Sequence, residues 1–218
     1  MSSLCSPNGP VKRAFDVAWA LASLLVLGPV LLLCALAVYL DDGWPIFYIQ
    51  ERVGRSGRVF PFFKFRTMVR NAERMGAGME IEERDPRITR TGHFLRRWSL
   101  DELPQLLNIL RGEMSVVGPR PTLAYQVARY TPRQRRRLEV RPGLTGLAQV
   151  SGRNRLPWPE RIELDIEYID RYTPWLDLVL IARTFGILRD ASVVYGEGWA
   201  RRPGDPGYPS NPAPEETP

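Results

Sequence analysis

The feature that most constrains this chain is a run of 24 uncharged, mostly apolar residues from Val17 to Leu40, bracketed by Asp16 and Asp41. As a helix, the run would be roughly 36 Å long, enough for a hydrocarbon core of about 30 Å. It is too long for a cleaved signal peptide, and no small-residue cleavage site follows it. The run therefore predicts a membrane-embedded segment near the N-terminus.

Gly28 and Pro29 lie at the midpoint of the run and predict a kink or a break. Proline removes a helical hydrogen bond and disfavours helix for the residue before it. A kinked spanning helix would put the N-terminus and the rest of the chain on opposite sides of the membrane, whereas a re-entrant hairpin would put them on one side. Basic residues flank both ends, which suits the hairpin, but kinked spanning helices are common, so both interpretations stay open.

The net charge of the 218-residue chain is +6, and Lys12 and Lys64 are its only lysines, so arginine supplies almost all of the positive charge. Guanidinium groups bind phosphates bidentately, which makes anionic lipids, nucleotides and nucleic acids candidate partners. An arginine-biased base composition explains the charge equally well. Cys5, Cys34 and the single His93 exclude a disulfide framework and zinc spacing. The length predicts one domain with appendages.

After the apolar run, the pattern predicts a compact, mainly helical α+β domain. Aromatic and apolar segments on either side of Val53–Gly57 predict a small β-hairpin between Ile46 and Met68. Helices are expected over 131–139, 161–172 and 175–188, and the last has the composition of an interfacial amphipathic helix. Proline, glycine and glutamate dominate from residue 201 onward, which predicts a disordered tail.

Asp101 and Glu102 are the leading candidates for chemistry. Pro104 places both acids in or just before the first turn of a helix, whose predicted apolar face is Leu103, Leu106, Leu107 and Leu110. Two adjacent carboxylates can divide phosphoryl transfer between a nucleophile and a Mg²⁺ ligand, and a helix start stabilises anions. Ser99 and Glu102 also fit a capping box, which is the simpler interpretation of this pair alone.

Arg120 lies between Pro119 and Pro121, which stiffen its backbone. This arrangement suits a phosphate clamp, although an ordinary turn has the same sequence. The arginines of 133–137 could contact nucleic acid, lipid headgroups or water, and the lack of interleaved aromatic residues makes nucleic acid the weakest of the three. Gly143 and Gly146 fit either close approach to a nucleotide or a simple turn.

Taken together, these residues resemble the bacterial sugar transferase family, the monotopic polyprenyl-phosphate phosphoglycosyl transferases. The resemblance runs from Lys12 to about Glu197, nearly the whole chain outside the tail. Besides the interrupted apolar run, its matching segments are Lys12–Asp16, Gln50–Gly54, Phe63–Met68, Asp85–Thr89, Leu95–Gln105, Asn108, Met114–Pro121, Arg141–Gln149 and Gly152–Asn154.

The resemblance implies transfer of sugar 1-phosphate from a UDP-sugar to polyprenyl (undecaprenyl) phosphate, giving polyprenyl-diphosphate-sugar and UMP. This is the first membrane step of exopolysaccharide, O-antigen or glycoconjugate biosynthesis. By motif, Asp101 is the nucleophile that takes the phosphosugar covalently, and Glu102 is its partner in Mg²⁺ binding. The implied substrate- and phosphate-binding residues are Arg66, Arg96, Arg120, Arg141 and, with a looser match, Asp165. Family members handle galactose, glucose and N-acetylated hexoses, so the resemblance implies a class of sugars.

The family's apolar segment is a re-entrant hairpin, and Gly28 stands where serine is frequent before the proline. The expected organisation is an N-terminal extension (1–11), a membrane hairpin (12–41), a catalytic domain (42–197) and a tail (198–218), without a further transmembrane bundle. The expected location is the cytoplasmic face of the bacterial inner membrane. Expected partners are a UDP-sugar, polyprenyl phosphate and the lipid bilayer, with a homodimer as an open option and no nucleic acid.

Two rival functions use the same residues. A Mg²⁺-dependent membrane phosphodiesterase or pyrophosphatase could employ the same two acids. Alternatively, a single-span anchored protein could bind a partner through its arginine cluster.

Overall fold

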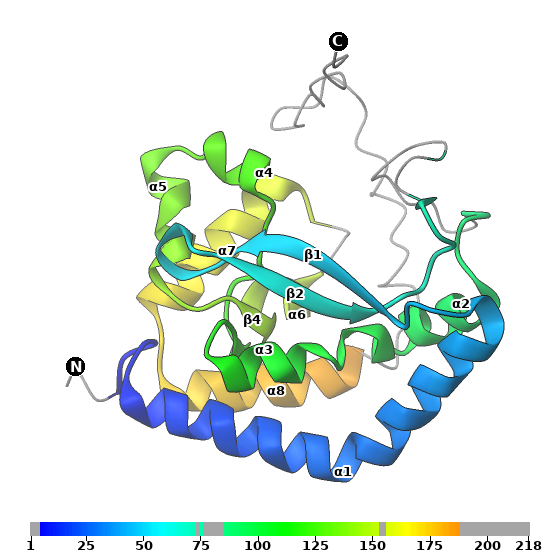
Figure 1. The fold of residues 1–218 in the computed structure, drawn as a ribbon. Helices are drawn as coiled ribbons and strands as arrows, with labels where there is room; N and C mark the ends of the chain where they lie inside the picture. The colour runs from blue at the N-terminus through cyan, green and yellow to red at the C-terminus, as the bar shows by residue number, and fades with distance from the viewer. Residues whose placement is uncertain (1–4, 73–74, 76–84, 153–155, 188–218) are drawn as a thin grey trace.

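Helix α1 (Pro10–Asp42) is the longest element of the fold. It begins at a proline, whose missing N–H is not needed in the first turn, and Gly43 follows its last residue with a φ of 70°, which favours glycine. Pro29 lies inside the helix, and Figure 1 shows α1 bent near its middle. The helix-break-helix predicted over 12–41 is thus wrong in detail. One continuous helix bends instead, because a proline can kink a helix without ending it.

The computed structural model describes residues 5–72, 75, 85–152 and 156–187. Within these ranges, helices surround two small two-stranded sheets, which confirms the predicted mainly helical α+β class. The predicted tail lies outside the described residues, as do residues 73–74, 76–84 and the matched residues 153–154.

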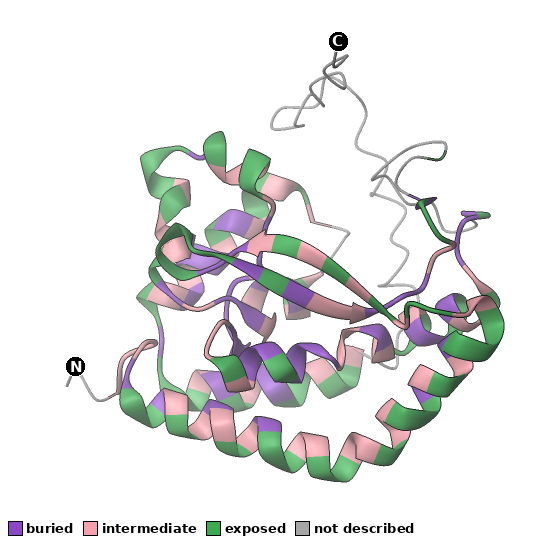
Figure 2. Cartoon of the chain, viewed as in Figure 1, coloured by how far each residue is buried: buried purple, intermediate pink, exposed green. Residues whose placement is uncertain are grey.

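One side of α1 faces the rest of the protein and the other faces outward. Of the described helices, α1 is the one that is long and apolar enough to cross a membrane. Leu25, Leu32 and Leu40 are 73–83% exposed, and Figure 2 shows exposed residues along the outer side of the helix. Ala20 in the first half joins the main core, while Cys34 in the second half packs with Phe65 and Leu95. Both halves of α1 therefore contact the same domain.

The predicted hairpin is confirmed. Strands β1 (Phe47–Val53) and β2 (Val59–Phe65) are antiparallel, with Phe47 opposite Phe65 and Val53 opposite Val59. The connecting turn, η2 (Arg55–Gly57), uses positive φ at Ser56 and Gly57. Because side chains alternate between the faces of a strand, Tyr48, Gln50 and Arg52 share one face with Phe60, Phe62 and Lys64.

Three short elements lie between the hairpin and the second sheet: α2 (Arg90–Arg97), the 3₁₀ turn η4 (Leu100–Glu102) and α3 (Gln105–Arg111). The predicted apolar face of α3 is only partly correct, because Leu107 is 42% exposed while Asn108 is fully buried. Asn108 accepts a hydrogen bond from the Phe63 N–H (3.2 Å) and donates to the Pro61 carbonyl (2.6 Å). A polar side chain thus fixes α3 to the hairpin.

Strands β3 (Ser115–Val117) and β4 (Gly143–Thr145) form a parallel pair. The two backbones approach so closely beyond β3 that a Cβ on Gly143 would lie 2.1 Å from the Gly118 nitrogen. Glycine is therefore required at position 143 because the strand backbones pack closely there. This packing, rather than a turn, accounts for Gly143.

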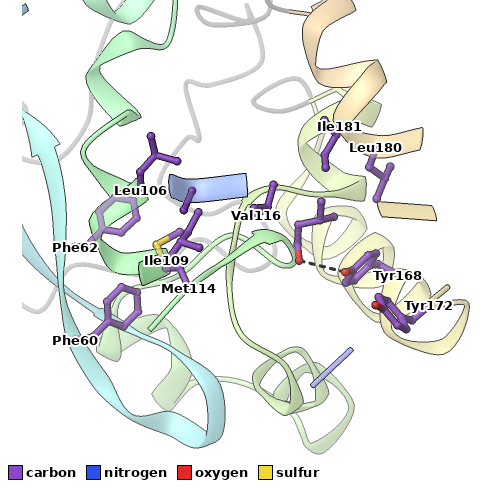
Figure 3. Packing of buried hydrophobic residues seen from close by; sticks show 12 residues of the cluster. Phe60, Phe62, Leu106, Ile109, Met114, Val116, Tyr168, Tyr172, Leu180 and Ile181 are labelled. Carbon is purple, nitrogen blue, oxygen red and sulfur yellow. Dashed lines mark hydrogen bonds between the residues drawn. The ribbon is translucent and has the colours of Figure 1, made fainter. Parts of the chain in front are cut away.

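Between residues 124 and 187, the described residues outside β4 are mainly helical, and α8 packs on both strands of the second sheet. The helix predicted over 131–139 is divided into α5 (Pro132–Arg135) and η5 (Arg136–Glu139), and the remaining elements are α4 (Ala124–Ala128), α6 (Leu147–Ser151), α7 (Trp158–Asp170) and α8 (Pro174–Ile187). Figure 3 shows the main core, where Tyr168 and Leu180 from α7 and α8 pack near Val116. The Tyr168 hydroxyl donates to the Val117 carbonyl at 3.2 Å.

Candidate active site

The acid pair, Asp101 and Glu102, lies in the 3₁₀ turn η4, just before α3. Ser99 precedes it with φ 53° and makes no side-chain capping bond, and Pro104 stands at the start of α3. The capping box that the spacing of Ser99 and Glu102 suggested is therefore wrong, because the left-handed backbone at Ser99 is not that of an N-cap residue. Since Ser99 and Glu102 do not form a capping box, the surroundings of the acid pair are defined by the charged side chains next to it.

Glu102 is held between two cations. Arg120 contacts both of its carboxylate oxygens, with Nη1–Oε2 at 3.1 Å and Nη2–Oε1 at 2.5 Å. Lys64 from β2 approaches Oε1 at 3.0 Å. Bidentate guanidinium pairs fix geometry as well as charge. Two predicted site residues that lie 18 positions apart in the sequence, Glu102 and Arg120, thus form a direct ion pair in the structure.

Asp101 is 7% exposed, and its carboxylate lies 3.8 Å from the Lys64 ammonium group. Burial raises the pKa of Asp101, and the neighbouring Glu102 charge raises it further, while Lys64, Arg96 and Arg120 oppose the shift. The anionic form of Asp101 therefore depends on nearby positive charge. A carboxylate held in this way can act as a nucleophile only where cations compensate its charge.

Four cations surround the acid pair, and we call them the cation cluster: Arg52, Lys64, Arg96 and Arg120. Arg96 donates from Nε to the Thr67 hydroxyl at 2.8 Å and acts electrostatically on Asp101. Arg52 and Lys64 lie on the same face of the hairpin, each 5.6 Å from the centre of the Phe62 ring. Burial and the charge of Arg120 lower the pKa of Arg52 to about 10. Four cations beside two acids form a site with excess positive charge.

Sequence reasoning did not identify Lys64 or Arg52 as site residues. One signal was available, since the strand alternation of the predicted hairpin puts Arg52 and Lys64 on one face once the register is known. The register depends on the turn at Arg55–Gly57, which composition alone does not fix.

Three of the predicted binding residues lie against other groups. Arg66 pairs with Asp42 at 2.9 Å and donates to the Asp42 and Gly43 carbonyls, so it fastens the end of α1. Arg141 donates to the Gly112 carbonyl at 3.1 Å, just after α3. Asp165 is 2% exposed and forms an ion pair with Arg137. Their substrate-binding roles stay predictions.

The described residues contain no group of three or more His, Cys, Asp or Glu side chains placed to hold a metal ion. A magnesium ion in a phosphoryl-transfer site commonly uses one or two carboxylates and completes its shell with water and substrate phosphates. The acid pair meets that smaller requirement, and the buried Asp101 is a carboxylate whose charge a cation would stabilise.

Comparison with known proteins identifies the family. A sequence profile of the bacterial sugar transferase family matches residues 7–190. The uncharacterized sugar transferase EpsL of Bacillus subtilis is 42% identical over 174 residues, covering 80% of this chain and 85% of EpsL. The exopolysaccharide production protein ExoY of Rhizobium meliloti is 42% identical over 192 residues, covering 81% and 84%.

A third relative is longer. The undecaprenyl-phosphate galactose phosphotransferase of Salmonella typhimurium is 39% identical over 188 residues, which cover 80% of this chain but only 39% of that protein. The acid pair, the hairpin and the Arg120 turn all lie within residues 7–190, which the family profile matches. This chain belongs to the bacterial sugar transferase family.

Proposed function

We propose that this chain transfers a sugar 1-phosphate from a UDP-sugar to polyprenyl (undecaprenyl) phosphate, producing polyprenyl-diphosphate-sugar and UMP. The observation that carries the proposal is the acid pair, with Asp101 buried and Glu102 half-buried, inside a cluster with more cations than acids. The names of the Salmonella and Rhizobium relatives, which specify an undecaprenyl-phosphate substrate and exopolysaccharide production, support it.

The reaction takes two displacements at one phosphorus atom. First, an Asp101 carboxylate oxygen attacks the sugar-bearing phosphorus of the donor, an O–P bond forms, and the phosphoanhydride breaks with its electron pair leaving on UMP. Second, a phosphate oxygen of the polyprenyl acceptor attacks the same phosphorus. The Asp101–phosphorus bond then breaks, and the carboxylate is regenerated. A soluble donor and a lipid acceptor can thus use one nucleophile in turn.

The cation cluster would stabilise negative charge on the transferring phosphoryl group. Arg120 and Lys64 already approach Glu102 within 3.1 Å, and preorganised cations need no rearrangement as charge develops. Arg52 adds a buried guanidinium whose Nε has no hydrogen-bond partner among the described residues. A phosphate oxygen would supply the acceptor that this N–H lacks.

Asp101 and Glu102 would hold Mg²⁺ together with the donor phosphates. When bound, the ion would neutralise phosphate charge and act as a Lewis acid at the reacting phosphorus. Glu102 would then share its oxygens between the ion and the Arg120–Lys64 pair, so its role is to couple the metal to the phosphate clamp.

Helix α1 would lie in the cytoplasmic leaflet of the inner membrane as a re-entrant segment. Both of its halves pack on the same domain, which a straight spanning helix would not permit. Exposed aromatic residues on α2 and α8, namely Phe94, Trp98 and Trp175, would lie at the lipid interface. The cytoplasmic face follows from chemistry, because nucleotide sugars are made there.

The direct test exposes the purified protein to UDP-sugar and Mg²⁺ without acceptor. We expect one equivalent of UMP and an intact-mass increase equal to one hexose phosphate, lost again when polyprenyl phosphate is added. A panel of UDP-sugars would identify the donor. Continuous UMP release without an adduct would instead support a phosphodiesterase or pyrophosphatase.

Topology is tested with protease-accessible tags at both termini in sealed vesicles. We expect both tags on one side for the native chain and a partly inverted population for Pro29→Leu, because leucine straightens the helix. Tags on opposite sides in the native chain would favour a single-span anchored protein.

A further inference from the structure

A buried ion pair contacts the main chain of the turn that carries Arg120. Arg137 of η5 pairs with Asp165 of α7, and the two residues are 4% and 2% exposed. The same guanidinium donates from Nη2 to the main-chain carbonyl of Arg120 at 3.0 Å. The pair thus joins α7 to the backbone of the residue that contacts Glu102.

Further hydrogen bonds fix Thr122, two residues after Arg120. Arg137 Nη1 donates to the Tyr130 hydroxyl at 2.6 Å, and that hydroxyl lies 3.3 Å from Thr122 Oγ1. The Thr122 carbonyl accepts a hydrogen bond from the Val53 N–H at 2.8 Å. The Arg120 main chain is therefore held by η5, and Thr122 is held by Tyr130 and by the hairpin.

Stability alone does not account for this arrangement. Burying an ion pair costs desolvation energy that the attraction often only offsets, so apolar residues of similar size would serve as well or better. Directional donors, by contrast, constrain where their acceptor lies. The Arg120 side chain is 41% exposed, so little else fixes its position apart from Glu102 and its own main chain.

We propose that Arg137 and Asp165 are positioning residues that hold the Arg120 main chain and thereby aim the Arg120 guanidinium at Glu102 and the transferring phosphate. This inference rests on the proposed function. It gives Asp165 a role at one remove from the substrate, in place of the direct binding that the resemblance implied.

The titration of Asp165 adds a measurable signature. Burial raises the pKa of Asp165 to about 6, although Arg137 and Arg161 oppose the shift. The groups that face it are Arg137 from η5, Arg161 from its own helix and, through Arg137, the Tyr130 hydroxyl. Because the native pKa is raised, Asp165 is neutral below about pH 6 and loses its charge attraction to Arg137 there. The turn should loosen as the pH falls through this value.

The test measures the single-turnover rate of adduct formation for Asp165→Asn and Arg137→Lys, each made in the native chain and in Arg120→Ala. In the native background we expect losses of about 100-fold, the scale of a misplaced reacting group. In the Arg120→Ala background we expect each substitution to have almost no further effect. Asp165→Asn should also remove the part of the decline in rate at low pH that is centred near pH 6.

The matched control is Asp170→Asn, which breaks the exposed Arg136–Asp170 pair between the same two elements (2.6 Å) and should leave the rate unchanged. Equal losses in both backgrounds, or a lowered Tm with an unchanged rate, would overturn the proposal. Should Asp165→Asn not fold, Tyr130→Phe removes one contact of Arg137 and must show the same dependence on Arg120. Absence of an adduct in the native chain would instead reject the proposed function itself.

Discussion

Two clusters of charged and polar side chains in this protein contain the same kinds of residues but differ in their role. The first, which we call the anchor cluster, consists of Lys12, Asp16, Ser115, Tyr168 and Asp177, all 4% exposed or less. Lys12 pairs with Asp177 at 2.7 Å, and Asp16 accepts from the Ser115 hydroxyl and the Val116 N–H. These contacts join α1 to β3 and α8, so the anchor cluster fastens α1 to the domain, although Asp16 Oδ2 has no hydrogen-bond partner among the described residues.

The acid pair with its cation cluster differs from the anchor cluster in net charge and in exposure to solvent. Two acids face four cations, and the Arg120 side chain is 41% exposed, whereas the anchor cluster is closed. An excess of positive charge with one open side attracts anions, while a closed cluster has room for none. Charge balance and exposure, rather than residue type, therefore separate the binding site from the structural network.

The largest expected difference follows from one substitution made in each cluster. Asp101→Asn should lower turnover at least about 10⁴-fold, because it removes the proposed nucleophile, while leaving Tm unchanged or higher because burial disfavours the charge. Asp16→Asn should lower the free energy of unfolding by about 1–2 kcal/mol and leave the rate per folded molecule nearly unchanged. UMP release and thermal unfolding measure both. Full activity in Asp101→Asn would show that the acid pair, like the anchor cluster, has only a structural role.

Glu102→Gln should lower turnover by about 10²- to 10³-fold, because Arg120 and Lys64 lose the charge that holds them. The matched control is Glu163→Gln, which removes the exposed partner of Arg133 (2.6 Å) and should have no effect on the rate. Similar losses in both variants would show that the contact with Arg120 has no special role.

Asp177→Asn tests the anchor cluster by stability. It leaves the buried Lys12 ammonium without a charged partner, which should cost about 3–5 kcal/mol. Denaturant unfolding in detergent measures this loss, and the double variant Lys12→Met with Asp177→Leu should recover most of it. Adduct formation by the folded fraction should persist. Loss of adduct formation in folded Asp177→Asn would make the anchor cluster part of the active site.

The smallest expected effect is a shift of the pH profile. The raised pKa of Asp101 means that its anion is lost as the pH falls, at a higher pH than for a free aspartate. Arg96→Gln should move this acid limb to still higher pH, because Arg96 opposes the shift. The loss of rate caused by Asp101 protonation should persist in Asp165→Asn, so this variant distinguishes the titration of Asp101 from that of Asp165. An unmoved limb in Arg96→Gln would place Arg96 outside the field of Asp101.

The local sequence pattern was sufficient to predict the position of several helices and strands. The hairpin between Ile46 and Met68 and the helices near 161–172 and 175–188 appear within a few residues of their predicted bounds, because strand alternation and apolar periodicity are local signals. The bend in α1 was marked by Pro29. Leu107 shows the limit, since an apolar residue at helical spacing lies outward while Asn108 is buried to bind the hairpin.

The sequence by itself determined the long apolar segment, the mainly helical class, the acid pair and the family resemblance, because each resides in neighbouring residues or ordered motifs. Only the tertiary structure decided which charges meet. It brought Lys64 and Arg52 to the acid pair, placed Arg66 at the end of α1, and put Asp165 behind Arg120 through Arg137. Such contacts join residues far apart in the chain, and electrostatic energy depends on distance and burial in space, which residue order does not specify.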